Sequence, residues 1–148
     1  MKKTSVILFT ALMAVSGLAS AQFNKPEDAV RYRKAGFTLM AAHFGRIGAM
    51  VNGKAPFDAA AAASNAQVVE QVGTLPWAGF VAGSEEGSKA KSDVWTNSAK
   101  FKEAADKFRA ESVKLTAAAK TGNQDQIKAA FGATAATCKG CHETFKKD

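Results

Sequence analysis

The spacing of apolar residues constrains the fold of this chain more than any other feature. Between residues 26 and 51, the stripe expected to face inward advances in steps of 3, 4, 3, 4, 3 and 4. Its members are Val30, Arg33, Phe37, Met40, Phe44, Ile47 and Val51. Such steps place side chains along one face of a helix that packs in a bundle. No segment alternates apolar and polar residues with β-branched enrichment, so we expect no strands.

Similar patterns predict four helices, over about residues 26–51, 57–72, 89–120 and 124–145. Asn24 is expected to cap the first helix, and Pro26 fits its first turn. Asn52-Gly53 ends it, and the second helix is rich in alanine, the best helix former. Helices joined by short links imply an all-α, antiparallel up-down-up-down four-helix bundle.

The third predicted helix has a heptad pattern in which large residues alternate with small ones. Its large residues are Val94, Phe101, Phe108 and Leu115. A helix over the whole of 89–120 would be over ~40 Å long, so we expect it to begin later than Lys89 or to fray.

The segment between the second and third helices, residues 73–87, breaks the helical pattern with Pro76 and four glycines, yet contains Leu75, Trp77 and Phe80. A loop this long and this apolar must fold back onto the protein. Either it closes one side of the bundle, or Trp77 and Phe80 cover part of a cofactor.

The first 21 residues have the features of a cleaved signal peptide. Lys2 and Lys3 precede an apolar run at 6–15, and Ala19-Ser20-Ala21 matches a signal-peptidase site. The run is too short to span a bilayer, which takes ~20 residues, although an uncleaved anchor is the alternative. We therefore expect one domain, residues 22–148, without a membrane span.

The net charge falls from +7 to +5 when Lys2 and Lys3 are removed with the signal peptide. The charges are scattered along the chain, which is typical of a solvated surface with weak steering of acidic partners or membranes. No basic cluster with interleaved aromatic residues is present, so we expect no nucleic-acid binding.

The residues that carry chemistry are Cys138-Lys139-Gly140-Cys141-His142, a C-x-x-C-H motif typical of c-type haem attachment. Cysteines three apart on a helix share a face, so both thiols can reach the two vinyl groups at one porphyrin edge. His142 follows directly and can bind the iron axially. The signal-peptide pattern is consistent with this motif, since c-type haem is attached outside the bacterial cytoplasm.

Other uses of these residues are weaker alternatives. A redox dithiol usually follows a strand in a thioredoxin-like fold, and zinc needs four ligands where only Cys138, Cys141, His142 and His43 exist. A structural disulfide between Cys138 and Cys141 would close almost no loop. No acid–base pair is evident, so we do not expect an enzyme.

At this point the chain resembles the cytochrome c′ family, the class II c-type cytochromes, over its whole length after residue 21. Besides the C-x-x-C-H motif near the C-terminus, four stretches carry the resemblance: residues 22–33 (QFNKPEDAVRYR), 43–46 (HFGR), 75–77 (LPW) and 130–132 (AFG).

The resemblance implies one covalent haem c whose iron is five-coordinate, with His142 as its only protein ligand. Phe37 falls at the family position that lies over the open side of the iron. Arg33 falls at the position of a family arginine that lies near a haem propionate. The alternative for Arg33 is that its side chain extends to solvent. Lys146 replaces a frequent arginine beside the proximal face, so hydrogen bonding there is expected to differ. Six-coordinate relatives use a methionine of the first helix, for which Met40, or less plausibly His43, is the candidate.

The resemblance further implies a periplasmic protein that binds nitric oxide or carbon monoxide, transfers single electrons to a periplasmic redox partner, or does both. A homodimer formed through the first helix is expected. The alternative is a six-coordinate, low-spin electron carrier with a ligand from the first helix.

Overall fold

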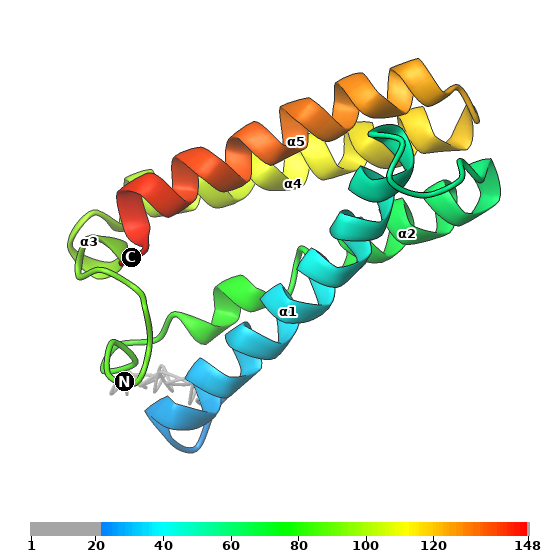
Figure 1. The fold of residues 1–148 in the computed structure, drawn as a ribbon. Helices are drawn as coiled ribbons and strands as arrows, with labels where there is room; N and C mark the ends of the chain where they lie inside the picture. Colours follow the sequence, from blue (N-terminus) through cyan, green and yellow to red (C-terminus); the bar gives the residue numbers. More distant parts are fainter. Residues whose placement is uncertain (1–21, 148) are drawn as a thin grey trace, which may run out of the picture.

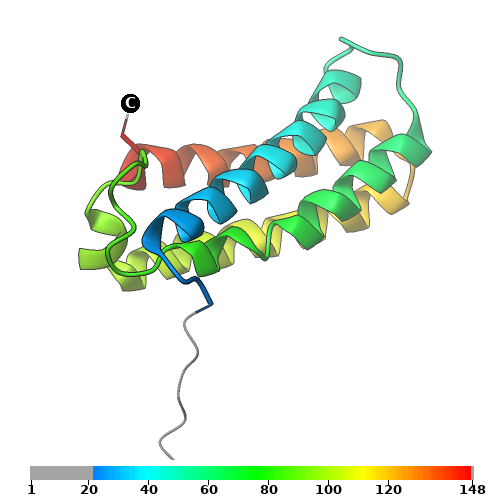
Figure 2. The same cartoon turned by 90° about the horizontal axis from the view of Figure 1, so that it is seen from below.

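A computed structural model describes residues 22–147. Four long helices form the fold: α1 (Pro26–Val51), α2 (Ala59–Val72), α4 (Ser98–Lys120) and α5 (Gln124–Phe145). Between α2 and α4 lie a short 3₁₀ helix, η1 (Pro76–Gly79), and one helical turn, α3 (Asp93–Thr96). The predicted all-α, antiparallel four-helix bundle is confirmed (Figures 1 and 2). The predicted cleavage after Ala21 lies outside the described residues.

The helices are arranged as two antiparallel pairs. Helix α4 runs alongside α5, and α1 alongside α2. The α4–α5 pair and α1 converge near the α1–α2 connection and diverge toward the opposite end of the molecule (Figure 1). The segment that contains η1 and α3 lies at this divergent end.

The core lies where the helices converge. Ile47, Val69, Leu115 and Ile127, one from each long helix, are fully buried in a single cluster. Burying an aliphatic side chain of this size stabilises the folded state by about 1.5–3 kcal/mol. A smaller cluster of Ala90, Val94 and Phe145 closes the divergent end. The space between the two clusters is left for the site described below.

Helix α1 begins at Pro26 as predicted but with a different cap, and helix α2 begins later than predicted. Helix α1 begins after Lys25, without a side-chain cap, so the prediction that Asn24 caps it was wrong. Helix α2 begins at Ala59, two residues later than predicted, because the Asp58 carboxylate accepts a hydrogen bond from the Ala61 amide at 2.9 Å. The ends of α1 and α2 and both ends of α5 agree with the prediction.

The third predicted helix begins at Ser98 rather than Lys89, as its excessive length suggested. The preceding residues pair instead with the end of α5: the Lys91 amide donates to the Phe145 carbonyl at 2.9 Å, and the Lys147 amide to the Lys89 carbonyl at 2.7 Å. An isolated antiparallel bridge between Ala90 and Lys146 results, the one β feature of residues 22–147. This pairing ties residues 89–91 to the turn after His142.

The segment after α2 packs closely against α1, because glycines stand at the contacts. A Cβ atom on Gly79 would lie 2.7 Å from the Ala29 carbonyl oxygen, and one on Gly36 would lie 2.9 Å from Pro76 Cγ. The apolar loop therefore folds back onto the bundle as predicted. No helix within residues 22–147 is long and apolar enough to cross a bilayer.

Candidate haem site

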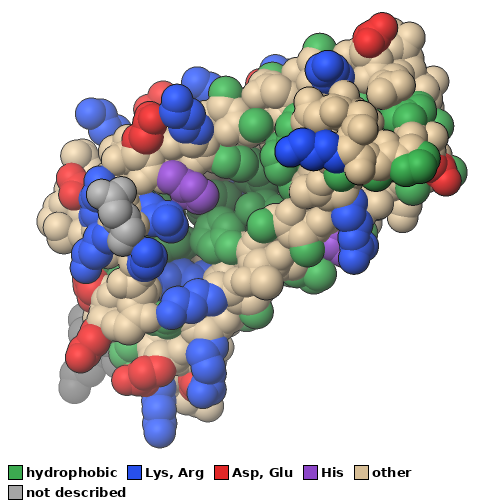
Figure 3. Space-filling view, viewed as in Figure 1, with side chains coloured by type: hydrophobic (Ala, Val, Ile, Leu, Met, Phe, Trp, Pro, Cys, Tyr) green, Lys and Arg blue, Asp and Glu red, His purple; other side chains and the backbone are tan. Residues whose placement is uncertain are grey.

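A cavity of about 700 Å³ lies between α1 and α5, and we call it the main cavity. Its surface is mostly apolar, and Lys and Arg side chains border the hollow in Figure 3. Cofactor pockets in proteins commonly measure about 300–1,000 Å³ and have apolar walls with few polar groups. The main cavity thus has the size and lining of a cofactor site.

Helix α5 places the predicted haem-binding residues on one wall of this cavity. Cys138, Cys141 and His142 all line it, and the two cysteines are half-buried. The two cysteines form no disulfide with each other. Burial raises the pKa of each thiol above its ordinary value, although a hydrogen bond with Thr137 acts in the opposite direction at Cys138. Both sulfurs are therefore protonated at neutral pH in the haem-free chain.

His142 lies at the edge of the main cavity and is partly open to solvent. Partial burial, and secondarily repulsion from Lys146 one turn away, lowers the pKa of its imidazole. A lower pKa favours the neutral ring, the form that binds metal ions. Within residues 22–147, no group of three or more His, Cys, Asp or Glu side chains is placed to hold a metal ion directly.

Helix α1 forms the opposite wall with Phe37, Met40 and Phe44. His43, the less plausible candidate for a sixth ligand, is not among the lining residues. Its Nδ1 lies 2.8 Å from Asn65 Oδ1 on α2, where the Asn65 amide is oriented by its bond to the Ala61 carbonyl. The structure therefore brings Met40, but not His43, to the main cavity.

Aromatic side chains form a third side. Trp77 and Phe80 both line the main cavity, so the loop does more than close the bundle. Phe37 packs edge-on against Trp77 with ring centroids 5.5 Å apart, and Phe80 packs against Phe101 at 4.7 Å. The Trp77 indole donates to the Gly73 carbonyl at 2.6 Å, which fixes its ring. Offset and edge-to-face pairs of this kind stabilise a defined arrangement of rings.

Arg33 is 3 % exposed, so the alternative that it extends to solvent was wrong. Its guanidinium donates to the Gly79 carbonyl, to Ser84 Oγ at 2.7 Å and to the Ser84 carbonyl at 2.5 Å. It also lies over the Phe80 ring, 4.4 Å from the centroid. Burial lowers the pKa of Arg33. The Arg33 side chain lines the main cavity. None of the ion pairs among the described residues includes it.

Sequence reasoning missed several residues at this site. Lys34 and Lys89 line the main cavity together with the predicted Lys146, and Phe101, Phe108 and Phe145 contribute to its floor. The sequence pattern assigned Phe101 and Phe108 only to the large positions of the third predicted helix. The regular large–small alternation of the third helix was the one available signal, because it leaves gaps beside large rings.

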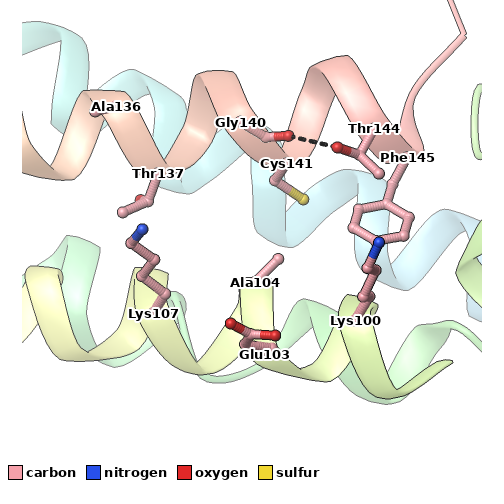
Figure 4. Close-up of a pocket in the computed structure, with 10 residues that line it drawn as sticks. All are labelled: Lys100, Glu103, Ala104, Lys107, Ala136, Thr137, Gly140, Cys141, Thr144 and Phe145. Atoms are coloured by element: carbon pink, nitrogen blue, oxygen red, sulfur yellow. Dashed lines mark hydrogen bonds between the residues drawn. The ribbon is translucent and has the colours of Figure 1, made fainter. Parts of the chain in front are cut away.

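A second, smaller depression of about 320 Å³ lies between α4 and α5 on the outer side of Cys141, and we call it the α4–α5 groove (Figure 4). Lys100, Glu103, Ala104 and Lys107 of α4 line it. The α5 side consists of Ala136, Thr137, Gly140, Cys141, Thr144 and Phe145. Three residues, Thr137, Cys141 and Phe145, line both this groove and the main cavity.

Comparisons with known proteins agree with this geometry. Residues 28–146 match the family model described as Cytochrome C′. The chain is 53 % identical over 128 residues to cytochrome c′ of Rubrivivax gelatinosus, covering 85 % of this chain and 99 % of that one. Its solved structure matches with a TM-score of 0.82, covering 85 % of this chain and 100 % of that one.

Two further structures are close in fold. Cytochrome c prime from Shewanella frigidimarina matches with a TM-score of 0.83 at 42 % identity, covering 85 % of this chain and 99 % of that one. A nitric oxide complex of a mutant of cytochrome c prime from Alcaligenes xylosoxidans matches with a TM-score of 0.81 at 46 % identity, covering 86 % and 99 %.

Proposed function

Because the chain belongs to the cytochrome c′ family, whose members carry one covalently attached haem c, we propose that Cys138 and Cys141 form the thioether bonds and that His142 is the axial iron ligand. The observation that carries this assignment is that all three side chains line one wall of the main cavity. The two thiols and one imidazole are the donors that c-type haem requires. The family consists of haem cytochromes rather than enzymes, in agreement with the expectation from sequence.

The bound haem supplies an iron that cycles between two oxidation states and offers coordination positions to small ligands. We propose that the iron is five-coordinate and that the protein binds nitric oxide or carbon monoxide. Phe37 and Phe44 present hydrocarbon to the cavity from α1 and provide no ligand atom. The nitric oxide complexes solved for a relative from A. xylosoxidans support a gaseous ligand.

The second candidate function is that of a six-coordinate electron carrier, and the observation in its favour is that Met40 lines the main cavity on the wall opposite His142. An absorption spectrum of the native protein, oxidised, reduced and with nitric oxide added, separates the two. A high-spin spectrum that changes with nitric oxide is expected. A low-spin spectrum with a methionine–iron band would establish the carrier instead, provided that this band is lost when Met40 is replaced.

Arg33, Trp77 and Lys146 have supporting roles in this proposal. Arg33 offers a buried cation to the main cavity, and a guanidinium carries five N–H donors, of which the loop engages three. It can therefore hold the loop and still meet an anionic group such as a propionate. Trp77 closes the aromatic side, and Lys146 places a point charge one turn after His142.

We propose that the protein acts in the periplasm, exchanges electrons with a redox partner there, and forms a homodimer through α1. The signal-peptide pattern of residues 1–21 supports the location. Leu39 supports the dimer, since it stands 47 % exposed on α1 beside small exposed residues such as Ala35 and Ala42. Fractionation of the native host tests the location. Sedimentation of Leu39→Glu against wild type tests the dimer, with a monomeric variant as the expected result.

A further inference from the structure

The main cavity approaches the outer surface of the molecule at a second place besides its open edge. Thr137, Cys141 and Phe145 separate it from the α4–α5 groove, since each of them lines both spaces. The wall between the two spaces is thus a single side chain thick. Ala104 and Gly140 line the groove beside Cys141, and Figure 4 shows the Cys141 sulfur pointing toward Ala104 of α4.

The lysines of this groove differ from their neighbours in lacking carboxylate partners. Lys102 pairs with Asp106 at 2.6 Å, Lys114 with Glu111 at 2.7 Å, and Lys139 with Glu143 at 3.7 Å. By contrast, none of the ion pairs among the described residues includes either of the groove lysines, Lys100 and Lys107.

Glu103 has the helical spacing to pair with either of them, yet it does so with neither. Figure 4 shows Lys107 reaching toward Thr137 and Lys100 toward Phe145, so the two ammonium groups cover the two ends of the groove. The groove thus has a cation at each end and the Glu103 carboxylate between them, and the remaining net charge of +1 complements a surface that presents carboxylates.

From this arrangement we infer that the α4–α5 groove docks an acidic surface segment of a one-electron redox partner, with Cys141 as the point of closest approach. The inference rests on the proposed haem attachment, because Cys141 matters for electron transfer only when its sulfur is bonded to the porphyrin. One electron then passes between the iron and the partner: one centre is oxidised as the other is reduced, and no atom or proton needs to move.

A binding map tests the docking without relying on electron transfer. The probe is hexacyanochromate(III), a redox-inert paramagnetic trianion, added to the ¹⁵N-labelled ferrous holoprotein with carbon monoxide bound, a diamagnetic low-spin form, with diamagnetic hexacyanocobaltate(III) as the reference of equal charge. We expect amide signals of residues 100–107 and 137–144 to broaden selectively. Broadening that leaves these residues untouched, for example broadening confined to Lys34, Lys89 and Lys146, would overturn the inference.

Kinetics with a matched control test the same claim. The double variant Lys100→Glu/Lys107→Glu should lower the second-order rate constant for oxidation of the ferrous protein by hexacyanoferrate(III) about tenfold at low salt, within the range of electrostatic steering. The control, Lys54→Glu/Lys128→Glu, changes the net charge equally at positions outside the groove and should alter the rate far less. High salt should remove the difference.

Equal rates for the two double variants would contradict the docking site. This failure is distinguishable from failure of the proposed function, since the haem content of every sample is read from its absorption spectrum. A haem-bearing protein with no groove-specific effect refutes only the docking inference, whereas a colourless protein refutes the haem assignment on which it rests.

Discussion

Replacing Arg33 by methionine is expected to lower the stability of the folded protein markedly, because this guanidinium joins α1 to the loop that forms part of the cavity wall. Methionine keeps the aliphatic volume but removes three hydrogen bonds, two to Ser84 and one to the Gly79 carbonyl. Ser84 is fully buried, so water could not replace the guanidinium as the partner of its carbonyl oxygen.

The magnitude follows from these contacts. Hydrogen bonds from a charged donor contribute about 1.5–3 kcal/mol each, and an unsatisfied buried carbonyl costs about 1–3 kcal/mol. The variant no longer pays desolvation of the guanidinium, which offsets several kcal/mol of this loss. We therefore expect the free energy of unfolding to fall by about 3 kcal/mol, out of the ~5–15 kcal/mol typical of a domain.

Urea unfolding of the holoprotein, followed by far-UV circular dichroism, measures the change. With a slope near ~2 kcal/mol/M, the midpoint should fall by about 1.5 M. The matched control is Lys34→Met, at the next position, whose exposed ammonium makes one bond to the Gly87 carbonyl and should change stability by no more than about 0.5 kcal/mol. An Arg33→Met midpoint equal to that of the control would refute the reasoning.

Four further predictions follow from the same structure. Phe37→Ala should raise the carbon monoxide affinity measured by spectroscopic titration, because it removes the ring expected over the open side of the iron, where the ligand would bind. An unchanged affinity would contradict the idea that this ring hinders the ligand. Gly79→Ala should destabilise the fold by about 1–3 kcal/mol, since its Cβ would meet the α1 backbone at 2.7 Å. Leu115→Ala, at a fully buried position, should cost about 3–5 kcal/mol, and a loss below 1 kcal/mol in urea unfolding would argue against the core. In the haem-free chain, burial raises the pKa of the Cys138 and Cys141 thiols above their ordinary value of 9.0, so the folded state holds these protons more tightly than the unfolded state does. The free energy of unfolding should therefore be constant with respect to these groups below pH 9.0 and fall as the pH rises above it. A free energy of unfolding that rises there would contradict the burial of the thiols.

The sequence was sufficient to predict the long helices, and it pointed to three candidate haem-binding residues that the structure places on one cavity. The 3–4 spacing from Val30 to Val51 and the turn residues at both ends define α1, and the structure has the same bounds. The C-x-x-C-H motif predicts Cys138, Cys141 and His142 as haem-binding residues without any tertiary information, because the prediction depends only on local spacing along one helix.

The features that the sequence did not predict depend on contacts between distant segments. The pairing of residues 89–91 with the end of α5 is a tertiary contact, and it is this contact that separates α3 from α4. The partners of Arg33 lie about fifty positions away in a loop without periodicity, so its burial was visible only as a charge on an apolar stripe. The groove lysines look like any solvated helix face until their neighbours' ion pairs are seen.

The intact mass of the protein purified from its native compartment tests the central claim most directly. After denaturation in acid and organic solvent, which removes haem that is not covalently bound, the account predicts the chain from Gln22 plus one haem, with no thiol open to alkylation. A mass equal to the polypeptide alone, with Cys138 and Cys141 both alkylated, would contradict it.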